Sequence, residues 1–247
     1  MSVVKNAPQE KLRIAFATHA YENVDFDAHF NHMYCAAHWA NMYDMYFIGR
    51  KFLQAADARN LIAKMAIEER CDWLFILDTD HIVTKNTLPL LLENKEEALV
   101  SGLICKKLYP YPQVVCLKNN KGEYIQYTLP LDGNLAEVAI APFGCTLINI
   151  AKLQQLKAPY FRDTCRKGAH GNLLNFRSDI NICEAFREAG MQVWVDTRVL
   201  VGHLGAKRCV YPQNAGFYKR GDEIGNELTN LRHGMVGDCN KFDGLTQ

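Results

Sequence analysis

The fold is most easily read from Trp73-Leu-Phe-Ile-Leu-Asp78-Thr-Asp80-His-Ile82. The first five residues are all apolar, which is typical of a β-strand that is buried on both faces. Asp78 and Asp80 follow at the carboxyl end of this strand, where open α/β sheets bind their ligands. Two neighbouring carboxylates repel each other, and a hard divalent cation suits their oxygen atoms. The segment therefore predicts a strand that ends in a metal site, and the alternative is a pair of residues that only cap a turn.

Strands and helices alternate on both sides of this segment. Strands are expected at 12–18, 45–48, 98–105, 143–150, 191–195 and 199–201, and helices at about 27–42, 57–70, 86–97, 151–156 and 178–189, with Asp57 and Ser178 as helix caps. Asn119-Asn-Lys-Gly122 is a hairpin signal, whereas the polar and basic residues 159–177 are expected to form a loop. This alternation is the signature of an α/β domain with a mixed, mainly parallel sheet flanked by helices.

The composition excludes several classes of protein. A chain of 247 residues with 49% hydrophobic residues can bury a sizeable core, and its formal net charge of +1 argues against a strong field toward nucleic acid or a membrane surface. No apolar run approaches the ~18 residues that span a bilayer, and residues 1–10 lack the apolar stretch of a signal peptide. Nine cysteines without a C-x-x-C pair indicate buried, reduced thiols in a cytoplasmic protein rather than a zinc ribbon. His29 and His32 could share a helix face, but they lack a third nearby ligand.

Further polar residues are expected at the sheet edge that carries the two carboxylates. Arg59 and Asn60 open the helix before the apolar strand, and the guanidinium of an arginine suits phosphate because it donates two parallel hydrogen bonds. Thr18 ends the first strand, and Tyr21 in the loop after it could stack on a nucleobase. The alternatives are a solvated Arg59, an Asn60 bonded to nearby backbone and a Tyr21 packed on the surface.

The order of these motifs resembles that of the GT-A fold glycosyltransferases, which use nucleotide-sugar donors. The matching segments are Ala58-Arg59-Asn60, Leu77-Asp-Thr-Asp80, Phe143-Gly-Cys-Thr-Leu-Ile148, the helix from Ser178 to Gly190, and Val199-Leu-Val-Gly-His203-Leu-Gly205. The resemblance covers residues 11–205, and the closest type is the small soluble enzyme encoded by viruses, phages or bacteria. It leaves 1–10 as an N-terminal extension and 206–247 as a C-terminal tail, a lid or an acceptor-binding element.

The resemblance implies a metal-dependent transfer of a sugar from a nucleoside-diphosphate sugar, with UDP as the expected nucleotide, to a hydroxyl acceptor. It implies Asp78, Asp80 and His203 as ligands of Mn²⁺ or Mg²⁺, Asp179 as the catalytic carboxylate, and Gly144, Cys145 and Ser178 on the substrate side, with Thr18, Tyr21, Arg59, Asn60 and Asp78 around the donor. Ser178 departs from the family pattern, which usually has an acidic residue there. The acceptor stays open among a glycan, a glycolipid, a protein and a modified nucleobase.

Some of these assignments also have a physical basis, and each has an alternative. At the first turn of a helix, Asp179 is favoured in its ionised form by the helix dipole, so it could accept a proton from the acceptor hydroxyl; otherwise it only stabilises the helix end. His203 could instead be satisfied by backbone at a strand end. Lys207 could close over the donor diphosphate or be an ordinary surface lysine.

Two other functions compete with the glycosyltransferase. A sugar-phosphate nucleotidyltransferase also uses an α/β sheet and acidic metal ligands, but it usually has a glycine-rich, lysine-bearing loop after the first strand. The residues Thr18-His-Ala-Tyr-Glu-Asn23 provide neither feature. The chain could also be a nucleotide- or sugar-binding module without catalytic activity.

Overall fold

The computed structural model describes residues 11–108, 110–167, 173–205 and 209–213. The elements follow in the order β1 (Arg13–Ala20), α1 (Phe26–Trp39), β2 (Asp44–Lys51), α2 (Ala55–Glu68), β3 (Trp73–Leu77), β4 (His81–Ile82), α3 (Thr87–Leu92), β5 (Leu99–Ile104), β6 (Cys116–Lys118), β7 (Tyr124–Gln126), β8 (Leu135–Val138), β9 (Cys145–Asn149), α4 (Ile150–Leu153), β10 (Thr164–Lys167), β11 (Leu173–Phe176), α5 (Ser178–Glu188), β12 (Val193–Leu204) and β13 (Cys209–Val210).

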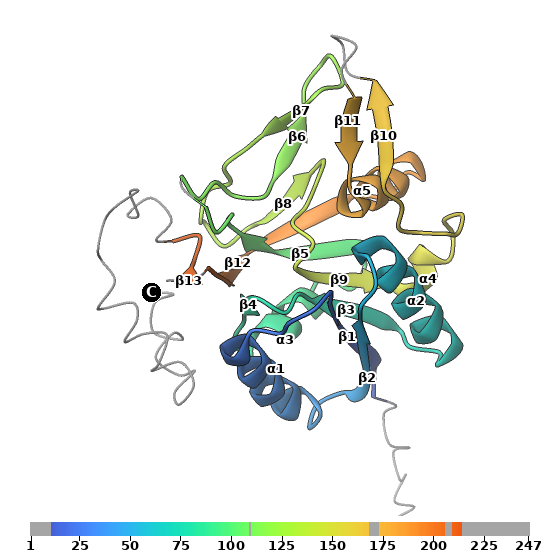
Figure 1. The fold of residues 1–247 in the computed structure, drawn as a ribbon, viewed down its shortest axis with the longest axis vertical. Coiled ribbons are helices and arrows are strands. Elements are labelled where there is room, and N and C mark those ends of the chain that lie inside the picture. Colours follow the sequence, from blue (N-terminus) through green and yellow to red (C-terminus); the bar gives the residue numbers. More distant parts are fainter. Residues whose placement is uncertain (1–10, 109, 168–172, 206–208, 214–247) are drawn as a thin grey trace, which may run out of the picture.

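A mixed sheet forms the centre of the described chain, with its strands in the order β13-β12-β5-β9-β3-β1-β2 (Figure 1). β1 runs parallel to β2 and β3, and β5 runs parallel to β12, whereas β9 is antiparallel to both of its neighbours, β3 and β5. Because β9 is reversed, its first residues lie at the edge of the sheet where β3 ends. The N–H of Asp78 accordingly donates to the carbonyl oxygen of Gly144 at 2.9 Å.

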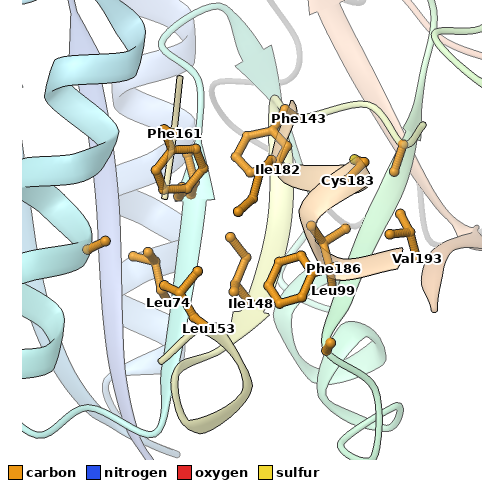
Figure 2. Packing of buried hydrophobic residues seen from close by; sticks show 14 of the residues in the cluster. Leu74, Leu99, Phe143, Ile148, Leu153, Phe161, Ile182, Cys183, Phe186 and Val193 are labelled. Carbon is orange, nitrogen blue, oxygen red and sulfur yellow. The ribbon is translucent and has the colours of Figure 1, made fainter. Parts of the chain in front are cut away.

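The sheet is covered by helices on both faces, and β3 shows how its sequence produces this arrangement. Leu74 and Ile76 belong to the cluster that includes residues of α2, α4 and α5, whereas Trp73, Phe75 and Leu77 belong to the cluster with α1 and α3. Successive side chains of a strand point to opposite faces, so an unbroken apolar run is what two covered faces require. Figure 2 shows the first cluster, in which Phe186 and Ile182 of α5 lie beside Ile148 of β9.

This arrangement confirms the predicted fold class, a mixed and mainly parallel sheet flanked by helices, and it is consistent with the Rossmann-like GT-A fold. The hairpin signal at 119–122 is confirmed as the turn between β6 and β7. No helix among the described residues is long and apolar enough to cross a membrane. Six of the eight cysteines in the described ranges are buried.

Several predicted helix boundaries are wrong. α2 begins at Ala55 with Gln54 at its N-cap, so Asp57 lies in the first turn and does not cap the helix. Arg177, not Ser178, holds the N-cap position of α5, and its side chain makes no capping hydrogen bond. α1 and α3 also end earlier than predicted, at Trp39 and Leu92. The ends of helices are set by backbone geometry and packing, which propensity only approximates.

Two strand predictions are also corrected. The expected loop at 159–177 contains the β10–β11 hairpin, which lies on the same side of the molecule as β6 and β7 (Figure 1). The two expected strands near the C-terminus are one long strand, β12, with a register shift between Asp196 and Leu200. Asp196 is buried there and is paired with Arg198 at 2.7 Å, so polar residues interrupt the apolar pattern inside a continuous strand.

Candidate metal and donor site

Asp80, His81 and His203 lie together at the edge of the sheet where β3 ends. His81 begins β4 and His203 belongs to β12, and the antiparallel pairing of these strands places the two residues opposite each other. Their imidazole rings are stacked, with centroids 4.4 Å apart. One ligand atom from each of the three residues lies within 4.8 Å of the others. The set of two imidazoles and one carboxylate is one that divalent transition metals accept.

The hydrogen bonds of His203 leave a nitrogen lone pair facing this cluster. Its Nδ1 lies 2.7 Å from the carbonyl oxygen of Cys105, and a carbonyl only accepts, so Nδ1 carries the hydrogen. In the neutral ring Nε2 is then an acceptor, and it lies 3.3 Å from Oδ2 of Asp80. Two acceptors at that distance need a cation or a proton between them. The residues present therefore fit a metal ion, with the second nitrogen of the ligand oriented by backbone as in many metal sites.

His81 is buried, and neither of its ring nitrogens has a hydrogen-bond partner among the described residues. Nδ1 lies 3.0 Å from Oδ1 of Asp80, without the geometry of a hydrogen bond. The backbone carbonyl of His81 accepts a hydrogen bond of 2.8 Å from Nε2 of His32, whose pKa burial lowers to about 4. A Cβ at Gly144 would lie 2.5 Å from Cε1 of His81, so only glycine leaves room for the ring. A buried imidazole that is packed this closely and has no hydrogen-bond partner among the described residues fits a metal ligand.

The carboxylate of Asp80 is held in its ionised form. Burial tends to raise its pKa, but with no metal between them, imidazole N–H groups of His203 and His81 that face the carboxylate, together with the ammonium group of Lys107, outweigh burial and hold that pKa well below its usual value. Nζ of Lys107 lies 2.7 Å from Oδ2. The site therefore offers an anionic oxygen to a cation at neutral pH.

Asp78 lies outside this cluster and faces a different set of groups. Its Oδ1 is 3.7 Å from the guanidinium of Arg59 and 3.8 Å from Nδ1 of His19. Arg59 is itself buried, donates to the hydroxyl of Ser178 at 3.2 Å and lies over the ring of Phe143 at 4.7 Å. Burial lowers the pKa of His19, and the carboxylate of Asp78 opposes that shift. Arg59 thus connects the start of α5 to the end of β3, and its role in phosphate binding stays a prediction.

A pocket of about 280 Å³ opens beside the cluster. The end of β1, the start of α2 and the turn after β3 line it, and its residues are His19, Ala20, Tyr21, Leu53, Gln54, Ala55, Asp78, Thr79 and Asp80. Tyr21 lines the pocket and is 56% exposed, so much of its side chain is open to solvent. The N–H groups of the first turn of α2 lack partners within the helix, as at every helix start. The pocket therefore combines a free aromatic ring, backbone donors and carboxylates.

The remaining predicted site residues are placed as follows. Asn60 bonds the backbone of Phe161 in both directions, at 2.7 and 3.0 Å, and Cys145 is fully buried in the core. Oγ1 of Thr18 is buried without a partner among the described residues. Asp179 lies in the first turn of α5 and accepts a hydrogen bond from the N–H of Ile180. Lys207 lies outside the described residues. The substrate contacts of all these residues stay predictions.

Three residues of the site were not predicted from the sequence: His81, His19 and Lys107. His81 directly follows Asp80 and could have been considered as a ligand on that basis. His19 lies near the end of β1, at the same edge of the sheet as Asp78. Lys107 follows β5, and nothing in its local sequence distinguishes it from Lys106.

No protein-family model and no curated protein matches the sequence. Among solved structures, the chain is similar to A197 from STIV, with a TM-score of 0.56 and 16% identity over 82% of this chain and 91% of that chain. Similarity at this identity shows a shared fold. A glycosyltransferase involved in the glycosylation of the major capsid of PBCV-1 matches 60% of this chain and 68% of its own with a TM-score of 0.33 and 15% identity, which is too low to establish a shared fold.

Proposed function

We propose that this protein is a metal-dependent glycosyltransferase that moves a sugar from a nucleoside-diphosphate sugar to a hydroxyl acceptor. The single observation that carries the proposal is the cluster of Asp80, His81 and His203 beside the pocket at the end of β3. The motif order that resembles the GT-A glycosyltransferases supports the same assignment.

The metal would be held by Asp80, His81 and His203. This set differs by one ligand from the set predicted from the sequence. His81 takes the place of Asp78, because the carboxylate of Asp78 faces Arg59 and His19 instead. Imidazole nitrogens favour transition metals over Mg²⁺, and Mn²⁺ also accepts carboxylate and phosphate oxygens, so Mn²⁺ is the proposed ion. When bound, such an ion stabilises the negative charge that develops on a departing diphosphate.

The pocket would hold the nucleotide. Tyr21 would stack on the base, and the start of α2 would donate backbone N–H groups to oxygen atoms of the donor. UDP is the nucleotide that we propose.

Asp179 would accept the proton of the acceptor hydroxyl. It lies next to Ser178, and the hydrogen bond from Arg59 to Ser178 fixes the start of α5 relative to Asp78. Its place in the first turn of α5 puts the carboxylate at the positive end of the helix dipole. General-base assistance is typically worth about 10²- to 10⁴-fold in rate.

Thermal-shift measurements with UDP, with and without Mn²⁺, test the proposal, followed by hydrolysis and transfer assays with UDP-sugars. A ligand at 100 times its dissociation constant adds about 2.7 kcal/mol of stability, which is readily measured. We expect Asp80→Asn and His203→Ala to abolish the effect of Mn²⁺, whereas Glu68→Gln at the exposed far end of α2 should retain it. Full transfer activity in Asp80→Asn would refute the proposal, and tight UDP binding without turnover on any donor would support the binding module instead.

A further inference from the structure

Lys107 forms an ion pair with Asp80, one of the three residues that would hold the metal. Its Nζ lies 2.7 Å from Oδ2 of Asp80, and the same Oδ2 lies 3.3 Å from Nε2 of His203. Lys107 follows β5, whereas His203 belongs to β12, which pairs with β5. The ammonium group of Lys107 and the ring of His203 thus meet at the same carboxylate oxygen of Asp80.

An ammonium group and a divalent cation cannot both remain at this carboxylate oxygen at low cost. Two cations about 4 Å apart repel each other by roughly 1 kcal/mol per pair of unit charges in water and by more near a protein surface. The ion pair of Lys107 is partly exposed, with side-chain exposures of 45% for Lys107 and 31% for Asp80. Exposed ion pairs are weak, so a divalent cation that also gains two imidazole ligands would displace the ammonium group.

We propose that Lys107 is the counter-ion of Asp80 before the metal binds, and that it moves from the carboxylate to the donor diphosphate once the metal is in place. Before metal binding, the ammonium group of Lys107 balances the charge of the partly buried carboxylate, whose Oδ2 also lies beside Nε2 of His203. After metal binding, its long and flexible side chain is free beside the pocket that Asp80 lines, where a diphosphate supplies new anionic oxygens. Lys107 is thus a positioning residue for the metal and a binding residue for the donor, an inference that rests on the proposed function.

The chain offers a matched control in the adjacent Lys106. The backbone N–H of Lys106 donates to the carbonyl oxygen of Pro112, and its charge acts on the thiol of Cys116, whereas the lysine that forms an ion pair with Asp80 among the described residues is Lys107. Lys106→Ala removes the same charge from the same loop without removing the ion pair to Asp80. Lys107→Arg retains a positive charge at the position of interest.

The experiment measures Mn²⁺ affinity by electron paramagnetic resonance without nucleotide, and UDP affinity by calorimetry at saturating Mn²⁺. For Lys107→Ala we expect Mn²⁺ to bind about 2- to 5-fold more tightly, the range that an exposed ion pair supports. We expect UDP to bind several-fold more weakly to the same variant. Lys106→Ala should match the wild type in both measurements, and Lys107→Arg should restore both affinities in large part.

Opposite changes in one variant distinguish this role from a merely structural one, which would weaken both affinities together. If Mn²⁺ binds through Asp80 but its affinity is unchanged or lower in Lys107→Ala, the inference about Lys107 is overturned while the proposed function stands. If Mn²⁺ tightens and UDP affinity does not change, the transfer to the donor is refuted. If the wild type binds no Mn²⁺, or binds it equally after Asp80→Asn, both the metal centre and the role of Lys107 are wrong.

Discussion

Gly144→Ala should disturb the candidate metal site although it substitutes none of the proposed ligands. The added Cβ would lie 2.5, 2.7 and 3.0 Å from Cε1, Nε2 and Nδ1 of His81, whereas ordinary contacts begin at 3.4 Å. The ring would have to move by about 0.9 Å (3.4 − 2.5) to escape the closest contact. It cannot do so freely, because it is stacked on His203 and its backbone carbonyl is bonded to His32. We therefore expect a loss of stability of about 1–3 kcal/mol, the usual cost of overpacking.

The same displacement should weaken metal binding. Metal–ligand distances tolerate shifts of about 0.2 Å, and changes in the groups that support a ligand typically lower affinity by about 10- to 100-fold. The assay is thermal and urea unfolding with and without Mn²⁺, in which 1 kcal/mol corresponds to about 2–4 °C for a chain of this size. Gly49→Ala is the control, since a Cβ at Gly49 meets nothing within 4 Å.

A double-mutant cycle decides whether the effect passes through the His81 ring. In the His81→Ala background the ring is absent, so adding Gly144→Ala should cost little further stability. The reasoning is refuted if Gly144→Ala alone leaves both stability and Mn²⁺ affinity unchanged. It is equally refuted if the costs of the two substitutions simply add.

Two further predictions concern the framework of the site. Asn60→Ala should destabilise the protein by about 1–3 kcal/mol in urea unfolding, because it leaves both backbone groups of Phe161 unpaired; a loss below about 0.5 kcal/mol would contradict this. Glu184 is bonded to Arg166 and to the hydroxyl of Tyr124; burial raises its pKa, but these partners outweigh burial and hold that pKa below the ordinary 4.5. The stabilising contribution of the ionised Glu184 is therefore complete above about pH 4.5 and is lost as the pH falls through its lowered pKa. The difference in the free energy of unfolding between wild type and Glu184→Gln should be constant near pH 7 and shrink below pH 4.5.

The sequence predicted the parts of the fold that local chemistry determines. The apolar run of β3 needs two covered faces, and Asn119 with Gly122, whose φ is +80°, forms the turn between β6 and β7. The direction of β9 could not be predicted, because an apolar strand has the same pattern in either direction. The β10–β11 hairpin was missed because polar contacts to α5, such as Arg166 with Glu184, support it in place of an apolar alternation.

Part of the site could also be predicted from the sequence. Asp80 and His203 lie close together, as the motif order implied. The spacing alone could not show that Asp78 faces other groups than Asp80 does, because its partners Arg59 and His19 come from α2 and β1. His81 was not predicted as a ligand because its ring is brought next to His203 by the pairing of β4 with β12, a contact between distant segments.

That pairing has a consequence for how the protein folds. Contacts between segments far apart in the sequence are slow to form, since a long loop must close before they gain any energy. His81 and His203 become neighbours only when β12 has joined β4, one of the longest-range pairings of the described chain. An ion that binds both imidazoles stabilises only chains in which this late step is complete, by an amount that grows with the free metal concentration. The concentration of free metal would then determine how stable the pairing of β12 with β4 is.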